Sequence, residues 1–391
     1  MTVSSRRVRI CVLTTMVPGS RQTGSEVVTH AFAEALRAAG HQTLVVGYRR
    51  TGTDPPLHPD DVVAGDRPIE TREAGPRAAL WMAQAVARRT PYTFAKFTSR
   101  RYRSVVRELL EERRVDAVIV DHAAMAWARP RGGGAPRWAY LAHNVEHRLY
   151  AAEARRGGAS GWASAREARL LEGVEAALAG SADQVWTLSD ADAAALADMG
   201  AAGRTRIFDL LPMAIPPTAR PNGEVDVAIL GTWTWSANRA GLNWFLGEVC
   251  PHLSQSLAVE VAGAGSEALG GSAPGVRMRG RVPEAMPFLQ RARVVAVPSV
   301  RGEGVQINTL DAIASGRPVV ATPTAIRGID QLPPTVAVAE DPEEFAARLA
   351  AAAAAPVDAS AAQAARAWIE ARRTAFERGV AHAVDELVAG S

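Results

Sequence analysis

The segment VVAVPSVRGEGVQINTLDAIASGRPVVAT, residues 294–322, combines residue types that could hold one ligand through two kinds of contact. It reads as an apolar strand, a glycine-bearing loop and a helix, so the N–H groups of a helix N-terminus follow the loop. Such groups favour anions, including phosphate. Glu303 and Asp311, with seven residues between them, add carboxylates that accept hydrogen bonds from neighbouring hydroxyls of a polyol. Phosphate and polyol together indicate a sugar nucleotide.

This segment resembles the donor-site signature of retaining glycosyltransferases of family 4, which have the glycosyltransferase-B (GT-B) fold. The family pattern is a Glu, seven residues and a second Glu opening "EAMA-G-PVV"; here Asp311 opens DAIASGRPVV. The resemblance implies that Glu303 contacts the donor sugar and Asp311 the ribose. Both carboxylates would otherwise merely cap a strand–helix turn, but the preceding strand, the Gly304 turn and GRPVVAT favour function. We include Gly302 and Val305 in the same donor loop.

The basic residues are almost all arginine, since Lys96 is the only lysine, and the net charge is +3. A pyridoxal phosphate enzyme needs a Schiff-base lysine in its pocket, and phosphorylases of this same fold carry one in the C-terminal domain. The sequence therefore predicts no cofactor beyond a nucleotide-sugar co-substrate. Any cation on a diphosphate must be arginine, and we assign Arg301 as catalytic and Arg239 as donor-binding on electrostatic grounds.

The composition is that of a globular protein of two or three domains, with 391 residues, 48% hydrophobic and 22% charged. Cys11 and Cys250 lie in different halves and in apolar settings, which indicates buried thiols in a reducing compartment. The apolar run Val8–Leu13 is too short for a signal peptide, and no run reaches membrane-spanning length. We expect a cytoplasmic protein, free or peripheral to the inner face of the membrane.

Short apolar strands alternate with amphipathic helices, which predicts parallel sheets in doubly wound α/β domains. Residues 51–74, polar and rich in Pro and Asp, are expected to form a long surface loop. The main expected helices are Ser25–Ala39, Ser99–Arg113, Trp162–Ala179 and Asp190–Met199. The expected strands are Val8–Leu13, Thr43–Val46, Ala117–Val120, Trp138–Leu141, Gln184–Leu188, Val225–Leu230, Ala258–Ala262, Gly275–Met278, Val294–Val297 and Pro318–Ala321.

The proline-rich stretch LLPMAIPPTARPNGEVD marks the best candidate for an interdomain linker. We therefore expect an N-terminal Rossmann-like acceptor domain over residues 1–212 and a linker over 213–224. A C-terminal Rossmann-like domain for the donor nucleotide would follow over 225–365. The resemblance further implies two facing domains and a last helix, residues 366–391, that packs back on the N-terminal domain.

The loop after the first strand leads into SEVVTHAFAEALRAAGH and resembles the family's "GG–E" loop before a helix ending in "L–GH". Only Gly24 of the glycine pair is present. Backbone N–H groups there could approach the donor phosphate or the transferred sugar. The alternative is an ordinary strand–helix turn, and ALRAAGH favours the functional interpretation.

The segment WAYLAHNVEHRLY lies at the end of a strand, where open α/β sheets bind ligands. It resembles the "HNVE" segment of exopolysaccharide-type sugar transferases within family 4. His143 is a candidate catalytic residue, because a neutral imidazole can bind a sugar hydroxyl or stabilise charge in the transition state. Asn144, Glu146 and His147 are candidates for acceptor binding. The competing interpretation is a histidine satisfied within a turn, with Glu146 capping the next helix.

Asp190 and Asp192 form a D-x-D pair, which holds a metal with the diphosphate in a different glycosyltransferase fold. Here Ser189 and Asp190 start a helix directly after a strand, so capping and the helix dipole explain the pair. We predict no metal.

GTWTWSANRAGLNWFLGEVCPHL resembles the opening of the family's donor domain. Gly231 ends a strand there, and Asn238 is expected to cap the following helix near the diphosphate. In relatives, the residues after a "G-V" pattern, which corresponds to Gly280–Pro283 here, hold the nucleobase through their backbone. On that basis Arg281 and Val282 are included in the donor site.

Residues 88–114 hold nine basic and three acidic residues. A basic amphipathic helix can dock on anionic lipid, so peripheral membrane contact through this segment is one interpretation. A solvated helix face is the other, and we favour it. Nucleic-acid binding is not expected, because aromatic residues do not alternate with the charges.

The sequence thus predicts a glycosyltransferase that moves a sugar from a nucleotide sugar to a hydroxyl-bearing or sugar-containing acceptor with retention of configuration. Glycan, lipid-linked saccharide and secondary metabolite stay open as acceptors. A nucleotide-sugar epimerase of the same fold would need no acceptor. A non-catalytic sugar-binding protein of two similar domains is the third class, and such proteins are usually exported.

Overall fold

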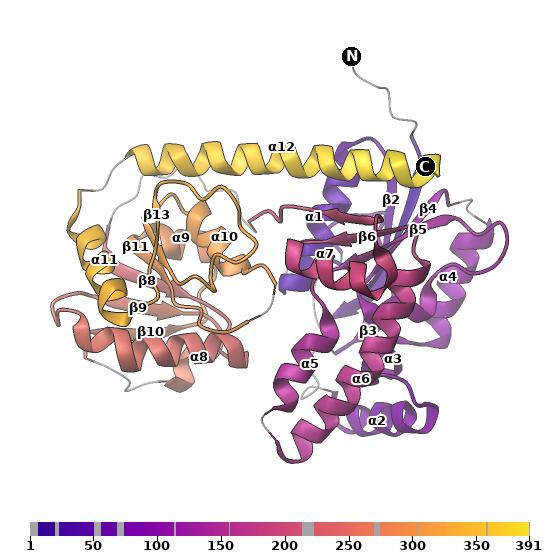
Figure 1. Ribbon diagram of the computed structural model, residues 1–391, viewed down its shortest axis with the longest axis horizontal. Helices are drawn as coiled ribbons and strands as arrows, with labels where there is room; N and C mark the ends of the chain where they lie inside the picture. Colours follow the sequence, from indigo (N-terminus) through magenta and orange to yellow (C-terminus); the bar gives the residue numbers. More distant parts are fainter. Residues whose placement is uncertain are drawn as a thin grey trace. The chain divides into compact units, whose positions relative to one another are not determined.

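The computed structural model describes residues 7–19, 23–50, 56–68, 74–112, 115–155, 157–212, 223–269, 274–302, 304–356 and 359–390. The chain divides into two compact units (Figure 1). The first consists of Met1–Leu210 and Ala375–Ser391, and the second of Leu211–Thr374. Most of the expected linker, residues 213–222, lies outside the described part of the chain.

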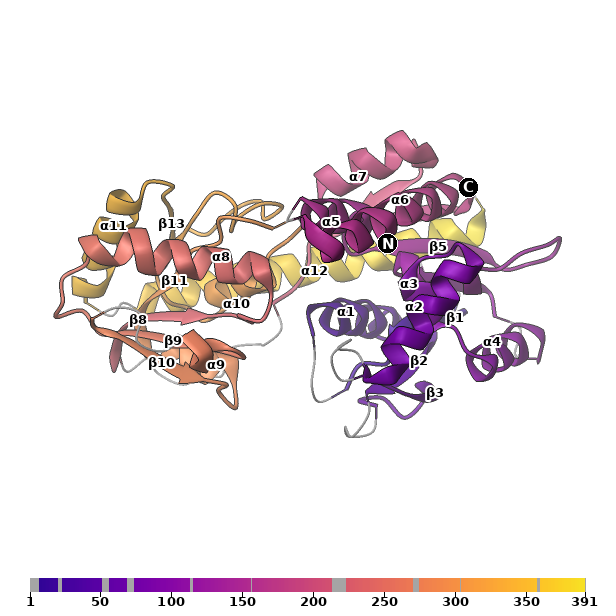
Figure 2. The same ribbon diagram turned by 90° about the horizontal axis from the view of Figure 1, so that it is seen from below.

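The first unit is built on a parallel sheet of seven strands in the order β3-β2-β1-β4-β5-β6-β7. Helices α5 and α6 lie side by side, as Figures 1 and 2 both show. The strands are β1 Arg9–Met16, β2 Gln42–Arg50, β3 Val62–Arg67, β4 Ala117–Asp121, β5 Arg137–Ala142, β6 Gln184–Thr187 and β7 Thr205–Ile207. The helices are α1 Gly24–Ala38, α2 Pro76–Arg88, α3 Tyr92–Phe97, α4 Arg100–Glu112, the 3-10 helix η2 Ala123–Ala128, α5 Glu146–Ala154, α6 Gly158–Ser181, α7 Asp190–Leu196 and the π-helical η3 Ala197–Ala201.

The second unit has a parallel sheet of six strands in the order β10-β9-β8-β11-β12-β13. Its strands are β8 Val225–Leu230, β9 Val259–Ala262, β10 Val276–Gly280, β11 Ala292–Val297, β12 Val319–Ala321 and β13 Val336–Val338. Its helices are α8 Ser236–Trp244, η4 Phe245–Val249, η5 Cys250–His252, η6 Ser266–Leu269, α9 Ala285–Gln290, α10 Ile307–Ala314, α11 Pro342–Ala354 and the first half of α12 Ala359–Ala389.

Both sheets reverse their direction of winding once. The chain first builds outward from β1 to β3 and then continues on the other side of β1 with β4; the second sheet does the same between β8 and β11. Open α/β sheets bind ligands at the carboxyl ends of the strands at such a reversal. Each unit therefore has one place where its topology favours a site.

The central strands are mostly apolar because helices cover both faces of each sheet. In β1 the residues from Ile10 to Leu13 are fully buried. This pattern explains why the doubly wound α/β fold was predictable, and the prediction is confirmed, with all ten expected strands present. The expectation that residues 51–74 form a loop throughout is wrong, because β3 lies within them. β3 is an edge strand in which only Ala64 is buried, so it carries no strong apolar pattern.

Helix α12 is continuous from the second unit into the first, so the expected return of the C-terminal helix is confirmed. In the second unit its residue Ala362 lies against Gly316. In the first unit Phe376 joins an aromatic cluster with Phe32, Phe208 and Trp186, with ring centroids 5.0 to 6.3 Å apart.

Among the described residues, no helix is both long and apolar enough to cross a membrane. Both cysteines carry free thiols; Cys11 is buried and Cys250 half-buried.

Replacing Phe376 with alanine should destabilise the first unit by about 3–5 kcal/mol, because the change removes a fully buried ring and leaves a cavity. Urea unfolding followed by tryptophan fluorescence measures this, since Trp186 lies in the same cluster. Glu377→Ala, at an exposed position on the same helix, is the control and should change the free energy of unfolding by less than about 0.5 kcal/mol. Equal stability of the two variants would show that the return of α12 contributes little.

Candidate active site

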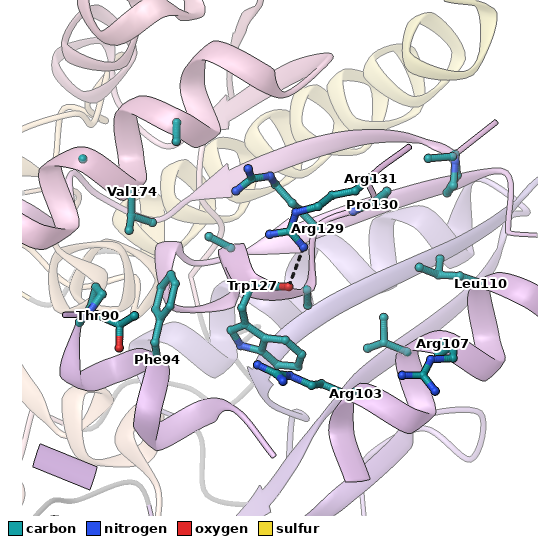
Figure 3. Close-up of a pocket in the computed structure, with 18 of the residues that line it drawn as sticks. Thr90, Phe94, Arg103, Arg107, Leu110, Trp127, Arg129, Pro130, Arg131 and Val174 are labelled. Carbon is teal, nitrogen blue, oxygen red and sulfur yellow. Dashed lines mark hydrogen bonds between the residues drawn. The ribbon is translucent and has the colours of Figure 1, made fainter. Parts of the chain in front are cut away.

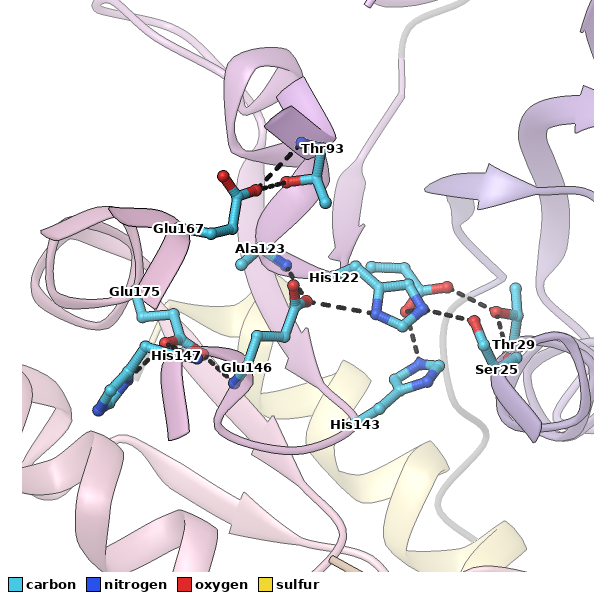
Figure 4. Close-up of polar contacts among 11 residues, drawn as sticks. Ser25, Thr29, Thr93, His122, Ala123, His143, Glu146, His147, Glu167 and Glu175 are labelled. Carbon is cyan, nitrogen blue, oxygen red and sulfur yellow. Dashed lines mark hydrogen bonds and ion pairs between the residues drawn. The ribbon is translucent and has the colours of Figure 1, made fainter. Parts of the chain in front are cut away.

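The reversal point of the first sheet gathers side chains from two segments almost a hundred residues apart. β1 leads to the N-terminus of α1, and the adjacent strand β4 ends in Asp121 and His122. The Ser25 hydroxyl on α1 lies 2.6 Å from His122 Nε2, and the Thr29 hydroxyl donates to Asp121 Oδ2 over 2.6 Å. Figure 4 shows the side chains of Ser25, Thr29 and His122 gathered at this position. A Thr23–Glu26 capping box fixes the first turn of α1 that carries them.

Asp121 is the centre of this network and is completely buried. Its Oδ1 lies 2.7 Å from His143 Nε2 and 4.0 Å from His122 Nε2. Burial alone would raise the pKa of the Asp121 carboxyl, but the nearby rings of His143 and His122 and the hydrogen bond from Thr29 lower it well below its usual range. The carboxylate is therefore ionised at neutral pH, and it fixes the ring of His143.

The rings of His122 and His143 lie with their centroids 4.0 Å apart, tilted by 48°, and their pKa values shift in opposite directions. Burial would lower the pKa of His122, but Asp121 and Glu146 raise it above its ordinary value. Burial and the nearby charge of His122 lower the pKa of His143 below its ordinary value, against the pull of Asp121. One ring thus favours the cationic form and its neighbour the neutral form, which is an arrangement suited to binding and polarising a hydroxyl.

The backbone of His122 adopts φ 76° and ψ 147°, a conformation that a residue with a side chain rarely takes. Such strain costs of order 1–3 kcal/mol and persists only where the surroundings impose it. Here Ser25 on one side and Glu146 on the other hold the ring (Figure 4). The strained position marks the end of β4 as a candidate for function rather than for folding alone.

Glu146 connects the histidine pair to helix α6. One carboxylate oxygen accepts a hydrogen bond from the N–H of Ala123, at the start of η2, and lies 3.5 Å from His122 Nδ1. The expectation that Glu146 caps its own helix is wrong. Glu175 on α6 caps α5 instead, accepting from the N–H groups of Glu146 and His147. Burial and the charge of Glu146 raise the pKa of Glu175 to about 8.

The structure distinguishes among the four candidates from HNVEH. His143 and Glu146 both join the Asp121–His122 network. His147 Nδ1 lies 2.7 Å from Glu175 Oε2, so its ring serves the local fold. Asn144 Oδ1 is buried and accepts no hydrogen bond from the described residues, which leaves it a candidate for a ligand hydroxyl.

Asp121, His122 and His143 could also hold one metal ion, because a ligand atom from each lies within 4.8 Å of the others. In the structure His143 lies at hydrogen-bonding distance from Asp121, and His122 Nε2 lies at that distance from Ser25. The prediction of a metal-free site therefore needs a direct experimental test. Asp192 does not belong to this set. Its carboxylate contacts the hydroxyl of Ser189 and the N–H of Val145, as expected of a residue in a helix cap.

The predicted donor residues of the second unit follow neighbouring strands at the carboxyl edge of its sheet. Gly231 follows β8, Arg281 and Val282 follow β10, and Arg301 follows β11. The backbone after β8 and the backbone after β9 lie very close together, because a Cβ added to Gly263 after β9 would lie 1.8 Å from the Gly231 carbonyl oxygen. The close approach and its φ of +116° explain why glycine occupies position 263.

The donor loop itself lies at the β8–β11 reversal. Gly302 and Gly304 have φ of +137° and +72°, in the region that favours glycine, so the loop turns sharply twice before α10. No side chain caps the first turn of α10, and Asp311 is buried within that helix. Arg301 is exposed and Val305 is half-buried. Glu303 lies outside the described residues.

Helix α8 packs directly against this loop, since a Cβ on Gly241 would lie 2.2 Å from the Pro298 carbonyl oxygen. The expected capping role of Asn238 is wrong. The helix begins at Ser236 with Trp235 as its N-cap, and Asn238 Nδ2 donates instead to the Thr232 carbonyl. Arg239 Nε donates to the Trp233 carbonyl, which fixes this arginine on the loop after β8.

Sequence reasoning missed Asp121, His122, Ser25 and Thr29. The signal that could have identified the first two is the dipeptide DH at the end of the buried strand AVIV. Ser25 was recognised only as the first residue of the expected helix Ser25–Ala39, and Thr29 lies on the buried face of α1.

Two family models match separate parts of the chain. Residues 22–208 match the model described as Glycosyltransferase Family 4, and residues 224–355 match the model described as Glycosyl transferases group 1. The two matches correspond to the first sheet with its helices and to the second. No curated protein sequence gives a significant match to the chain.

Solved structures show the same architecture over the whole chain. A sucrose-phosphate synthase from Thermosynechococcus elongatus is 16% identical, with a TM-score of 0.63 over 97% of this chain and 98% of the other. WaaG, a glycosyltransferase involved in lipopolysaccharide biosynthesis, is 17% identical, with a TM-score of 0.61 over 98% and 100%. HepE of Anabaena, solved with UDP-glucose, is 15% identical, with a TM-score of 0.58 over 98% of each chain.

Replacing Glu146 with glutamine should lower the pKa of His122, because the change removes one of the two carboxylates that raise it. NMR titration of the histidine Cε1–H signals measures this, with a His122→Gln variant to assign the resonance. Glu172→Gln is the matched control. It should lower the pKa of His147, whose charge Glu172 favours, and leave His122 unchanged. A His122 titration that is the same in Glu146→Gln and wild type would contradict the network.

Proposed function

We propose that this chain, which is a glycosyltransferase of the GT-B fold, transfers a sugar from a nucleotide sugar to an acceptor hydroxyl with retention of anomeric configuration. The observation that carries the proposal is the position of the donor residues in the second unit. Gly231 and Arg301 follow β8 and β11, the two strands at the winding reversal, where such sheets bind nucleotides, and Arg281 and Val282 follow β10 at the same carboxyl edge.

The donor is assigned to the second unit. The sharply turned loop with Gly302 and Gly304 can bring backbone N–H groups and the uncapped N-terminus of α10 to a phosphate. Arg301, exposed on the same loop, supplies positive charge as the diphosphate leaves, which lowers the barrier more than it strengthens ground-state binding. Glu303 and Asp311 are proposed to hold the donor sugar and the ribose.

The acceptor is assigned to the first unit. His143, fixed by Asp121, is proposed to bind the reacting hydroxyl, and the unpaired Asn144 Oδ1 a neighbouring one. His122, whose pKa is raised, adds positive charge beside the same position. No protein nucleophile is assigned. The acceptor hydroxyl attacks from the side of the leaving diphosphate, so the sugar keeps its anomeric configuration.

Residues 88–114 are the segment considered for peripheral membrane contact. The segment is not one helix: it contains α3 and α4 with a break between them. The apolar face of α4 is buried in the core, through Tyr102, Val106 and Leu109. A solvated basic face therefore fits α4 better than an inserted one. We propose a cytoplasmic enzyme whose contact with the membrane is electrostatic.

A screen of UDP, GDP, dTDP and ADP by thermal shift tests the donor assignment. One nucleotide should raise the melting temperature, since saturation at one hundred times Kd adds about 2.7 kcal/mol to the free energy of unfolding. With the corresponding sugar nucleotide, Glu303→Gln should lower turnover more than tenfold, because a charge-assisted hydrogen bond contributes roughly 1.5–3 kcal/mol. Glu343→Gln, exposed on α11, is the control and should keep wild-type turnover.

The same assay separates the other function classes. An epimerase would convert the sugar nucleotide without any acceptor. A sugar-binding protein would give neither transfer nor hydrolysis, and a protein that neither binds a nucleotide nor consumes a sugar nucleotide contradicts the proposal.

Metal independence is a separate prediction. Transfer should continue at the same rate in EDTA, because arginine and helix N-terminal groups are proposed to carry the leaving-group charge. Measuring initial rates before and after chelation, with Mn²⁺ and Mg²⁺ restored singly, decides the point. Loss of activity in EDTA with recovery on adding one ion would instead assign a metal, and His122→Gln would then show whether the Asp121–His122–His143 cluster holds it.

A further inference from the structure

The first unit contains a cavity of about 910 Å³ that the proposed mechanism does not use. It lies among α3, α4, α6 and the chain between η2 and β5 (Figure 3). Arginines from three separate segments line it: Arg89 directly after α2, Arg103 and Arg107 from α4, and Arg129 and Arg131 from the chain after η2.

Four of these arginines, Arg103, Arg107, Arg129 and Arg131, share the cavity with a single carboxylate, Glu111. Within the described part of the chain, none of them forms an ion pair. Arg103 lies over the Trp127 ring at 5.8 Å, and Arg131 donates to the Trp127 carbonyl. Burial and the neighbouring charge of Arg131 lower the pKa of Arg129, so the two cations repel each other. A fold gains nothing from crowding like charges, whereas a bound anion relieves the repulsion.

The rest of the cavity wall is apolar. Phe94, Leu110, Trp127 and Val174 are half-buried, and Val106 is buried. Glu111 is the only carboxylate among the lining residues, and Thr90 the only hydroxyl. A neutral sugar needs several acceptors for its hydroxyls, and this wall offers few. An apolar wall beside several arginines instead suits a molecule that has an anionic head group and a hydrocarbon chain.

We propose that this cavity, the arginine pocket, binds an anionic amphiphile: a molecule with a phosphate head group and an apolar chain. Arg129 and Arg131 would bind the phosphate with Arg103, and the chain would lie along Phe94, Leu110 and Val174. The pocket does not depend on the proposed glycosyl transfer. The pocket nevertheless lies near the histidine pair, and η2 connects the two. This 3-10 helix begins directly after His122, and its last residues, about 10 Å along the helix, line the pocket.

Isothermal titration calorimetry with monodecyl phosphate, below its micelle concentration, tests the pocket on the full chain. Decyl glucoside and inorganic phosphate are the comparison ligands, and each should bind at least tenfold more weakly. Hexyl phosphate should bind between them, since shortening the chain removes buried methylenes.

The double variant Arg129→Gln with Arg131→Gln should weaken binding of decyl phosphate at least tenfold. Arg155→Gln with Arg366→Gln removes the same charge at exposed positions outside the pocket and should stay within twofold of wild type. Circular dichroism and melting temperature establish that both variants are folded.

Three outcomes would overturn the proposal. Equal weakening in both double variants would show a non-specific charge effect. Equal affinity for inorganic phosphate and decyl phosphate would show an anion site without a place for the chain. Binding to vesicles of phosphatidylglycerol without binding of monomeric decyl phosphate would show contact with a membrane surface instead of an occupied pocket.

Discussion

The first unit depends on one buried negative charge at the end of β4. A carboxylate without solvent, as at Asp121, is stable only if its neighbours supply charge and hydrogen bonds. They come from Thr29 on α1, His143 after β5 and His122 beside it. The charge therefore fixes how three segments meet. The same contacts leave one imidazole inclined to be cationic and the other neutral, so the stabilising interaction also produces the chemistry of the site.

In the second unit, backbone segments approach one another closely beside the carboxyl ends of the strands, which is proposed to bring backbone groups close to the donor. Glycines at the ends of its strands allow this: Gly263 sits against Gly231, and Gly241 against Pro298. The donor loop can then turn twice and lead into α10 without a capping side chain. In both units the winding reversal opens the sheet edge at which these residues are found.

The fold was largely predictable because its signals are local. A continuous apolar strand such as AVIV indicates a buried parallel sheet, and a glycine after an amphipathic segment indicates a helix end. Both signals can be recognised without knowing the rest of the chain. The edge strands β3, β7 and β13 were missed, and β3 shows why, since it buries little and lacks that pattern. The acid–base network was only half predictable. His143 and Glu146 belong to a recognisable motif, but Ser25 meets His122 across 97 positions, and only the order of strands brings them together. The sequence also could not show that Arg129 and Arg131 after η2 share a cavity with Arg103 and Arg107, because only the packing of α4 brings the two pairs together.

The role of Asp121 is best tested by the kinetics of Asp121→Asn, which keeps the shape of the side chain and removes its charge. Asp116→Asn, at the opposite end of the same strand region, is the matched control, because its carboxylate only accepts from the N–H of Arg9. We expect Asp121→Asn to lower turnover more than tenfold while the Kd for the donor nucleotide stays within twofold, since the donor is proposed to bind the second unit. Wild-type turnover in a folded Asp121→Asn protein would contradict the assignment of acceptor chemistry to this network.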